Sequence, residues 1–506
     1  MSATKPTLWL LEDHLSHDLP LLHRHADAPV LLIESRHAMG MHPYHRHRLI
    51  FLVSAMRHFA DELRSAGRTV AHYPLRQHGY MDSLAAIRDH IRRTNCRSFL
   101  VTEPSEYHTR VWIESLPDML DIEIEFEPRT LLLTERQAFA SWARRLKSPV
   151  METFYRRMRK EHNVLMDRDQ PIGGTWNLDT ENRKPAPRSL RPPRPISFKP
   201  DAITRAVIAD VERAFPDNPG DAGAFDLPVT RDQALEALND FLDHRLPMFG
   251  DYEDAMLTDR PILYHSRLSP LLNAGLLLPM ECIRAAEERF HEGKAPLNSV
   301  EGFVRQILGW REYVYGIYWS FMPEYRERNA RRSTRPLPQC FWDGNCRMNC
   351  LKQTIGGVLE SGYSHHIQRL MILCNFATLV GINPQAVNDW FLAMYIDSHD
   401  WVVTPNVIGM GMNADGGTMA TKPYVSSAAY INRMSDYCAG CQYNPRTRTG
   451  EDACPFNYLY WTFLSHFRKQ LGKNPRMSMI LKHLDRIDPD EMRQMMKQRK
   501  QFIESL

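Results

Sequence analysis

The sequence lacks any apolar run long enough to cross a membrane. Its longest runs, Leu49–Ala55 and Gly275–Met280, are far shorter than the roughly 20 residues of a spanning helix. The first residues, MSATKPTLWLLEDHL, also lack the apolar core followed by small residues that marks a signal peptide. We therefore expect a soluble, cytoplasmic protein with no membrane contact.

A strong charge of one sign is missing as well. The 63 Lys and Arg residues nearly balance the 60 Asp and Glu residues, which leaves a net charge of +3. This balance excludes a histone-like polycation, so any nucleic-acid contact must rest on local basic patches. An apolar content of 43% excludes a disordered chain, and the length of 506 residues predicts about two to four domains. We expect a monomer.

Short apolar runs alternate with helical patterns at residues 1–135, and Ser54–Ala66 and Ser83–Arg93 carry the helical spacing. This alternation predicts an N-terminal α/β domain with a parallel sheet. The G-x-G-x-x-G motif of dinucleotide-binding domains does not follow the first run. The runs predicted as strands are Thr7–Leu11, Pro29–Ile33, Val70–Tyr73, Ser98–Thr102 and Ile122–Phe126.

A basic, proline-rich connector is predicted at residues 136–230. Ser141–Lys160 is strongly basic, and Lys184–Pro200 holds six prolines and five Lys or Arg residues without a helical period. The second segment is typical of an extended surface linker, with a phosphate-contacting loop as the alternative. Residues 231–506 then show apolar spacing near 3.6 residues, which predicts a large all-α domain. The predicted helices are Asp232–His244, Met280–Glu292, Val300–Met322, Asn349–Leu359, His365–Val380, Asn383–Met394, Asn457–Lys469 and Asp490–Glu504.

The chain has nine cysteines, which is an odd number, and it shows no export signal. A framework of disulfide bonds is therefore not expected. Cys96, Cys282 and Cys374 lie in apolar surroundings and are predicted as core residues. The remaining cysteines all lie from residue 340 onward. This clustering suggests a shared ligand.

The late cysteines predict a metal centre. Cys438-Ala-Gly-Cys441 is a C-x-x-C, and Cys454-Pro455 follows it. With Cys350, which begins a helical segment, these thiolates could hold zinc or an iron–sulfur cluster, and the spacing does not separate the two. Cys340 or Cys346 could replace Cys350, and unligated thiols are the plain alternative.

A serine-rich run suggests a phosphate-bearing cofactor. The sequence His265-Ser266-Arg267-Leu268-Ser269-Pro270 precedes NSVEGFVRQILGWREY at Asn298–Tyr313. Hydroxyls and free N–H groups at a helix N-terminus suit a diphosphate, although simple capping by the serines explains the run equally well. Both stretches resemble the FAD-binding half of photolyases and cryptochromes.

A second stretch narrows the resemblance. His365-His366 and Arg369 lie on one predicted helix, and Asp397 follows Arg369 by 28 positions. Together with the cysteines, they are similar to the bacterial iron–sulfur photolyase/cryptochrome family, whose photolyase activity concerns (6-4) photoproducts. The resemblance implies FAD in the helical domain and a structural [4Fe-4S] cluster on Cys350, Cys438, Cys441 and Cys454. It implies FAD-site positions at Tyr252, His265, Ser266, Arg267, Leu268, Ser269, Arg305, Trp310, Arg311, Tyr313, Arg369, Asp397 and Val403.

The same resemblance implies light-driven repair of DNA that carries ultraviolet lesions. His366 is the expected proton donor, because histidine holds and releases a proton near neutral pH. His365 would orient it or touch the substrate, and Tyr424 would lie near the lesion. Trp390 near the flavin and Trp342 further out would carry electrons, although a core position is the commoner fate of tryptophan.

Several residues depart from the family pattern. Val403 stands where a residue that hydrogen-bonds flavin N5 is expected, and Phe391 replaces an expected redox-active tyrosine. Leu11–Leu15 reads LEDHL, and Ala38 and Met41 replace polar and aromatic residues around a 6,7-dimethyl-8-ribityllumazine antenna, so the antenna is expected to be altered or missing. The alternatives to repair are a cryptochrome-type blue-light receptor and a cluster-bearing nucleic-acid-binding protein without photochemistry.

Cations interleaved with aromatic residues predict a DNA-binding surface around the connector. Such a pattern suits phosphate contacts and a flipped, unstacked base, while a solvated helix face is the alternative. The predicted DNA contacts are Arg156, Arg159, Lys160, Trp176 and Arg183.

Overall fold

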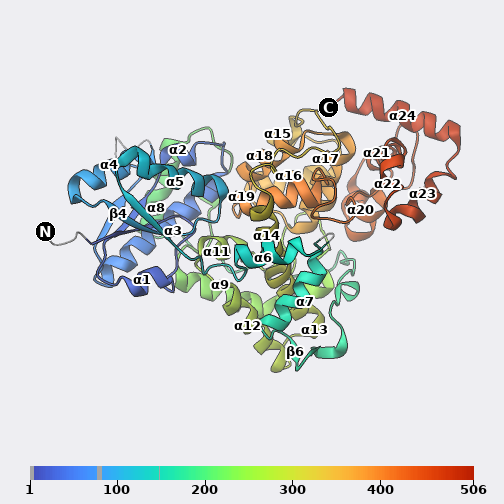
Figure 1. The fold of residues 1–506 in the computed structure, drawn as a ribbon. Coiled ribbons are helices and arrows are strands. Elements are labelled where there is room, and N and C mark those ends of the chain that lie inside the picture. The colour runs from blue at the N-terminus through green and yellow to red at the C-terminus, as the bar shows by residue number, and fades with distance from the viewer. Residues whose placement is uncertain (1–4, 77–81, 147–148) are drawn as a thin grey trace.

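The computed structural model describes residues 5–76, 82–146 and 149–506. Its N-terminal part is a five-stranded, wholly parallel sheet with the strand order β3-β2-β1-β4-β5, on the blue side of Figure 1. The strands are β1 (Thr7–Leu10), β2 (Val30–Ile33), β3 (Val70–Tyr73), β4 (Ser98–Thr102) and β5 (Glu123–Glu127). The predicted α/β fold is therefore confirmed, and each strand lies within about one residue of its predicted run.

Helices cover both faces of the sheet. Because strand side chains alternate, Trp9 of β1 faces the core under α4 (Ser83–Thr94) and α5 (Tyr107–Leu120), while Leu8 and Leu10 face the core under α3 (Arg46–Ser65). The helix α3 begins well before the predicted Ser54, since its first turns contain the apolar run Leu49–Ala55. The short helices α1 (Pro20–Arg24) and α2 (Arg36–Met39) complete this part.

The connector contains helices that pack on the parts that flank it. The helix α8 (Ala202–Ala214) lies beside α3, and α7 (Met151–Glu161) packs on the π-helical segment Arg305–Arg311 of the helical domain, with α6 (Arg136–Arg144) near α14 (Glu312–Phe321) (Figure 1). Residues 184–200 contain no helix or strand, as their prolines predict. The domain boundaries at residues 135 and 230 stay predictions.

The C-terminal part is helical, as predicted, and fills the green to red portion of Figure 1. The single helix predicted at Val300–Met322 is α13 (Leu297–Val304) and α14 joined through π-helical Arg305–Arg311. Two further π-helical segments, Gln368–Cys374 and Pro405–Gly411, follow the same pattern, and such segments are frequent at functional sites. The remaining helices are α9 (Arg231–His244), α10 (Leu246–Tyr252), α11 (Ser269–Ala274), α12 (Pro279–His291), α13 (Leu297–Val304), α15 (Cys340–Asp343), α16 (Asn349–Ser361), α17 (Asn375–Val380), α18 (Pro384–Met394), α19 (Asp400–Thr404), α20 (Ala428–Met434), α21 (Pro455–His466), α22 (Arg468–Leu471), α23 (Ser478–Leu484) and α24 (Pro489–Glu504).

Among the described residues, no helix combines the length and the apolar character that membrane crossing requires. The cytoplasmic location and the monomeric state stay predictions from the sequence. Cys96, Cys282 and Cys374 are buried, which confirms them as core residues.

Candidate active site

A partly buried ion pair joins two segments of the helical domain. The guanidinium of Arg369, in the π-helical segment, donates to both carboxylate oxygens of Asp397 at 3.1 Å each. Ser269 Oγ donates to the same carboxylate at 2.7 Å, and Asn273 Nδ2 donates to the Asp397 carbonyl at 2.9 Å. Burial raises the pKa of Asp397, but the Arg369 charge and these hydrogen bonds outweigh it, so its pKa lies below the usual value. The predicted pair therefore forms, at the N-terminus of α11.

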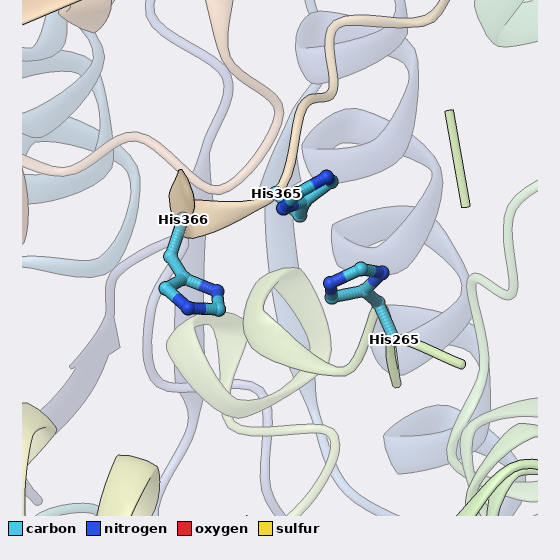
Figure 2. Close-up of side chains that lie close together, drawn as sticks. All are labelled: His265, His365 and His366. Carbon is cyan, nitrogen blue, oxygen red and sulfur yellow. The ribbon is translucent and has the colours of Figure 1, made fainter. Parts of the chain in front are cut away.

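Three histidines gather beside this pair. His265 lies just before α11, and His365 and His366 begin the helical turn that leads to Arg369 (Figure 2). The rings of His265 and His365 stack with centroids 4.1 Å apart, and the His366 ring lies about 6 Å from both, at 6.2 Å and 6.0 Å. Burial lowers the pKa of His265 to about 4 and that of His365 well below its usual value. Both rings are therefore neutral at pH 7.

His366 differs from its two neighbours because it has an acidic partner. Its Nε2 lies 3.2 Å from Asp254 Oδ1, and its side chain is 45% exposed. Burial lowers the pKa of His366, but the hydrogen bond and charge of Asp254, with the charge of Glu253, raise it above the usual value. His366 is thus the histidine of this cluster that is most readily protonated.

The sequence analysis missed Glu253 and Asp254, which directly follow the predicted Tyr252. Burial raises the pKa of Glu253 to about 7 despite the nearby charge of Arg305. Tyr430 donates from its hydroxyl to Asp254 at 3.2 Å, which fixes that carboxylate. The run Tyr252-Glu253-Asp254 was a signal that could have found them, but their pairing with a histidine 112 positions away depends on the tertiary fold.

Four cysteines line one small cavity in the C-terminal part. They come from the first turn of α16, from the 3-10 turn and extended residue after α20, and from the residue before α21. Met348, Tyr437 and Phe456 complete much of its apolar wall. Burial and the other three thiols raise the pKa of Cys350 well above its usual value, so the bare site disfavours four thiolates. The cysteines of the cavity are Cys350, Cys438, Cys441 and Cys454.

The donor set of this cavity fits the predicted iron–sulfur cluster, because four cysteine sulfurs in an apolar enclosure are its usual ligands. Cys340 and Cys346 do not line the cavity, and Cys346 Sγ instead lies 3.7 Å from the Cys340 carbonyl oxygen. Geometry therefore favours Cys350 over these two as the fourth ligand.

Comparison with known proteins identifies the family. Residues 8–227 match the family described as deoxyribodipyrimidine photo-lyase-related protein. A (6-4) photolyase of Agrobacterium fabrum is 46% identical over 440 residues, which are 86% of this chain and 86% of that protein. The chain belongs to the bacterial (6-4) photolyase family. The fold agrees with the crystal structures of an Agrobacterium tumefaciens class III photolyase (TM-score 0.57, 18% identity, 99% and 98% coverage) and a Synechocystis cryptochrome (TM-score 0.58, 15% identity, 97% and 93% coverage).

Membership in this family implies FAD, and two arginines of the helical domain fit such an anionic ligand. Arg267 has a φ of 58°, in the left-handed region, and its Nε lies buried without a hydrogen-bond partner in the described part of the chain. Arg311 is also buried, and its Nε and Nη1 lack partners among the described residues. These guanidinium nitrogens beside α11 fit the diphosphate of FAD, because its oxygens would accept the hydrogen bonds that they do not make within the part of the protein that the structure describes.

Some of the predicted FAD-site residues make other contacts. Tyr313 donates to the Pro149 carbonyl at 3.1 Å and packs on Phe139 and Phe154 of the connector helices, with Trp310 against it. Tyr313 therefore packs the connector onto the helical domain, and the assignment of Tyr313 and Trp310 to the FAD site stays a prediction. Other predicted positions have partners of their own: Tyr252 stacks on Tyr264, Leu268 is buried, Arg305 pairs with Asp179 and Glu301, and Val403 is buried in α19.

Aromatic contacts lead from the buried Trp390 to Arg369. Trp342 is exposed, and Trp390 is fully buried and donates from Nε1 to the Phe341 carbonyl at 3.0 Å. The Trp390 ring contacts Tyr395 at 5.9 Å between centroids, and the Arg369 guanidinium lies 4.0 Å over the Tyr395 ring. The sequence analysis missed Tyr395, which lies next in this chain of contacts.

The predicted DNA-binding residues lie in different environments. Arg156 and Lys160 are exposed and lie 5.7 Å and 5.5 Å from the Trp176 ring centroid, and Arg183 is exposed beside Asp179. Arg159, in contrast, is buried and donates to the backbone carbonyls of residues 164, 165 and 176. The prediction for Arg159 is therefore wrong, because its guanidinium is already used inside the protein.

Proposed function

We propose that this chain repairs (6-4) pyrimidine photoproducts in DNA in a light-driven reaction that uses bound FAD. The observation that carries the proposal is its similarity to a (6-4) photolyase over most of both chains. The geometry supports it, because the Arg369–Asp397 pair, the three histidines and the unpartnered arginines lie around α11.

Excited reduced FAD, when bound, supplies an electron to the damaged pyrimidines. The chain supplies the positions of the charged groups around it. Arg369 and Asp397 hold each other through two hydrogen bonds, and Ser269 fixes the carboxylate. Asp397 is buried and stays ionised, so the Arg369–Asp397 pair is a fixed dipole. Such a dipole would stabilise one charge state of bound FAD relative to the others.

His366 is proposed as the proton donor to the lesion. Asp254 holds the proton at Nε2, so the proton at Nδ1 of the imidazolium is the one free to transfer. Partial exposure of the His366 side chain supports access to an extruded base. His365 stays neutral and packs beside His366, where it would orient the donor.

Tyr424 is proposed near the lesion as well. It is half-buried, and burial together with the charge of Asp179 raises its pKa. Since Asp179 also pairs with Arg183, the tyrosine and the predicted DNA contact share one region. We propose that Arg156, Lys160, Trp176 and Arg183 contact the DNA backbone there.

The four-cysteine cavity is proposed to hold a [4Fe-4S] cluster with a structural role. Its ligands come from α16, the segment after α20 and the start of α21, so a bound cluster would tie three separate segments together. A lumazine antenna stays a prediction from the resemblance: Met41 is 67% exposed, and neither it nor Ala38 offers a polar side-chain group.

The deciding experiment is irradiation of a DNA oligonucleotide that carries one (6-4) photoproduct, with the purified protein in blue light and in darkness. We expect loss of the lesion in light alone. Persistence of the lesion in the light would overturn the repair proposal, and flavin photochemistry without repair would support the cryptochrome-type receptor, which the apolar Val403 favours.

A further inference from the structure

The imidazoles of His265, His365 and His366 lie close enough together that they could hold a metal ion. One ring nitrogen from each lies within 4.8 Å of those from the other two. Figure 2 shows the His265 and His365 rings lying one over the other, with the His366 ring beside them. A small movement of the rings would bring three nitrogens to one ion.

The tautomer of His265 leaves a lone pair inside this cluster. Its Nε2 lies 2.9 Å from the Glu253 carbonyl oxygen, which only accepts, so Nε2 carries the hydrogen. Nδ1 therefore carries the lone pair, and it is buried with no hydrogen-bond partner among the described residues. An unpartnered buried nitrogen of this kind needs an explanation.

His365 and His366 complete the set. His365 Nδ1 is also buried without a partner in the described part of the chain. His366 Nε2 faces the Asp254 carboxylate, so the neutral ring that keeps its hydrogen there has its lone pair at Nδ1. Metal-binding histidines usually donate their second nitrogen to a carboxylate or a carbonyl, and Asp254 and Glu253 provide one of each.

We propose that His265, His365 and His366 bind one zinc-class divalent cation, and that occupancy blocks the active site. Three imidazoles with an open fourth position are typical ligands of Zn²⁺, whereas Mg²⁺ and Ca²⁺ prefer oxygen ligands. The blocking effect rests on the proposed function, because a cation bound at Nδ1 of His366 would occupy the position of the proton that repair requires. The site would make repair sensitive to free zinc.

The test uses full-length protein with its bound cofactors and Zn²⁺ alone as the probe. Zinc X-ray absorption should show nitrogen neighbours at about 2.0–2.1 Å with imidazole scattering. A shell of sulfur at about 2.3 Å would place the zinc on cysteines and overturn the proposal. Because this measurement uses the unaltered chain, it does not depend on how a variant folds.

A variant pair tests the ligands individually. His265→Ala should weaken zinc affinity at least about tenfold in a competition titration with a chromophoric chelator. His291→Ala, at the exposed end of α12, should leave the affinity unchanged. Equal affinities in the wild type and His265→Ala would contradict the site.

Repair assays separate the two proposals. One equivalent of Zn²⁺ should abolish light-driven repair by the wild type, and a chelator should restore it. Repair that persists with zinc bound to the histidines would overturn the blocking effect. If repair is absent before zinc is added, the proposed function fails, while the absorption experiment still decides the metal site.

Discussion

His366 Nε2 and Asp254 Oδ1 lie 3.2 Å apart, and this contact joins a histidine of the active site to a carboxylate two residues after the end of α10. Tyr430 donates to the other oxygen of the same carboxylate. The histidine is therefore held in one orientation and stabilised in its charged form. Two consequences for repair follow from this contact.

The first prediction concerns pH. The pKa of His366 is raised, so the protonated donor is present below that pKa and is lost as pH rises through it. Asp254→Asn removes the charge, lowers this pKa and should shift the alkaline fall of the repair rate to lower pH. A pH–rate profile of both proteins measures this, and superimposable alkaline limbs would contradict the role of Asp254.

His366→Ala should reduce repair at least about 100-fold at the pH optimum, since general acid catalysis contributes about 10²–10⁴. Flavin retention, followed by absorbance, should not change, because His366 is partly exposed and makes its hydrogen bond to Asp254. Retained repair in His366→Ala would remove this residue from the proton-donor role.

The third prediction concerns the aromatic chain. Tyr395 lies between Trp390 and Arg369, while Phe391, its stacked neighbour at 5.0 Å, has no readily oxidised group. Trp390→Phe and Tyr395→Phe should each slow light-driven flavin reduction at least about tenfold, because electron transfer depends steeply on distance. Trp461→Phe in α21 is the control. A Tyr395→Phe protein that reduces its flavin at the wild-type rate would limit the path to the tryptophans.

The fourth prediction concerns the cysteine cavity. Cys350→Ser should lose bound iron and the visible absorption of the cluster, because it removes one of four ligands. Cys340→Ser is the matched control, since Cys340 lies outside the cavity and should keep the iron content of the wild type. Iron analysis of the two proteins decides between them, and the opposite result would make Cys340 the ligand.

The strands could be predicted because parallel strands buried on both faces form continuous apolar runs, as β2 and β4 do. Arg369 and Asp397 could be predicted as an ion pair, because their spacing in the sequence resembles that of the photolyase family. The partner of His366 could not, since Asp254 lies 112 positions away in the sequence and only the tertiary fold brings the two together. Tyr395 was missed for the same reason. Its contacts with Trp390 and Arg369 depend on the path that the chain takes after α18, which the sequence pattern does not give.

Arg159 shows a different limit, because its burial was readable from spacing. Met151, Phe154, Tyr155 and Met158 recur at the helical period, and residue 159 follows Tyr155 by one turn, so it lies on the same buried stripe of α7. The sequence analysis counted the cations of this segment together and so treated Arg159 like Arg156 and Lys160. The helical periodicity separates the buried Arg159 from these two exposed residues.

The last prediction uses this contrast within α7. Arg156 is exposed near Trp176, so Arg156→Ala should weaken DNA binding and reduce the salt slope of log affinity by about 1, as expected for one lost phosphate contact.

Arg159→Ala instead leaves three backbone carbonyls without their donor and should lower the free energy of unfolding by about 2–4 kcal/mol. Folded Arg159→Ala protein should keep the wild-type salt slope, because a guanidinium bonded to carbonyls releases no counterion from DNA. Binding titrations at several salt concentrations, with denaturant unfolding of the same samples, measure both effects. A reduced slope in Arg159→Ala at unchanged stability would reverse the two assignments.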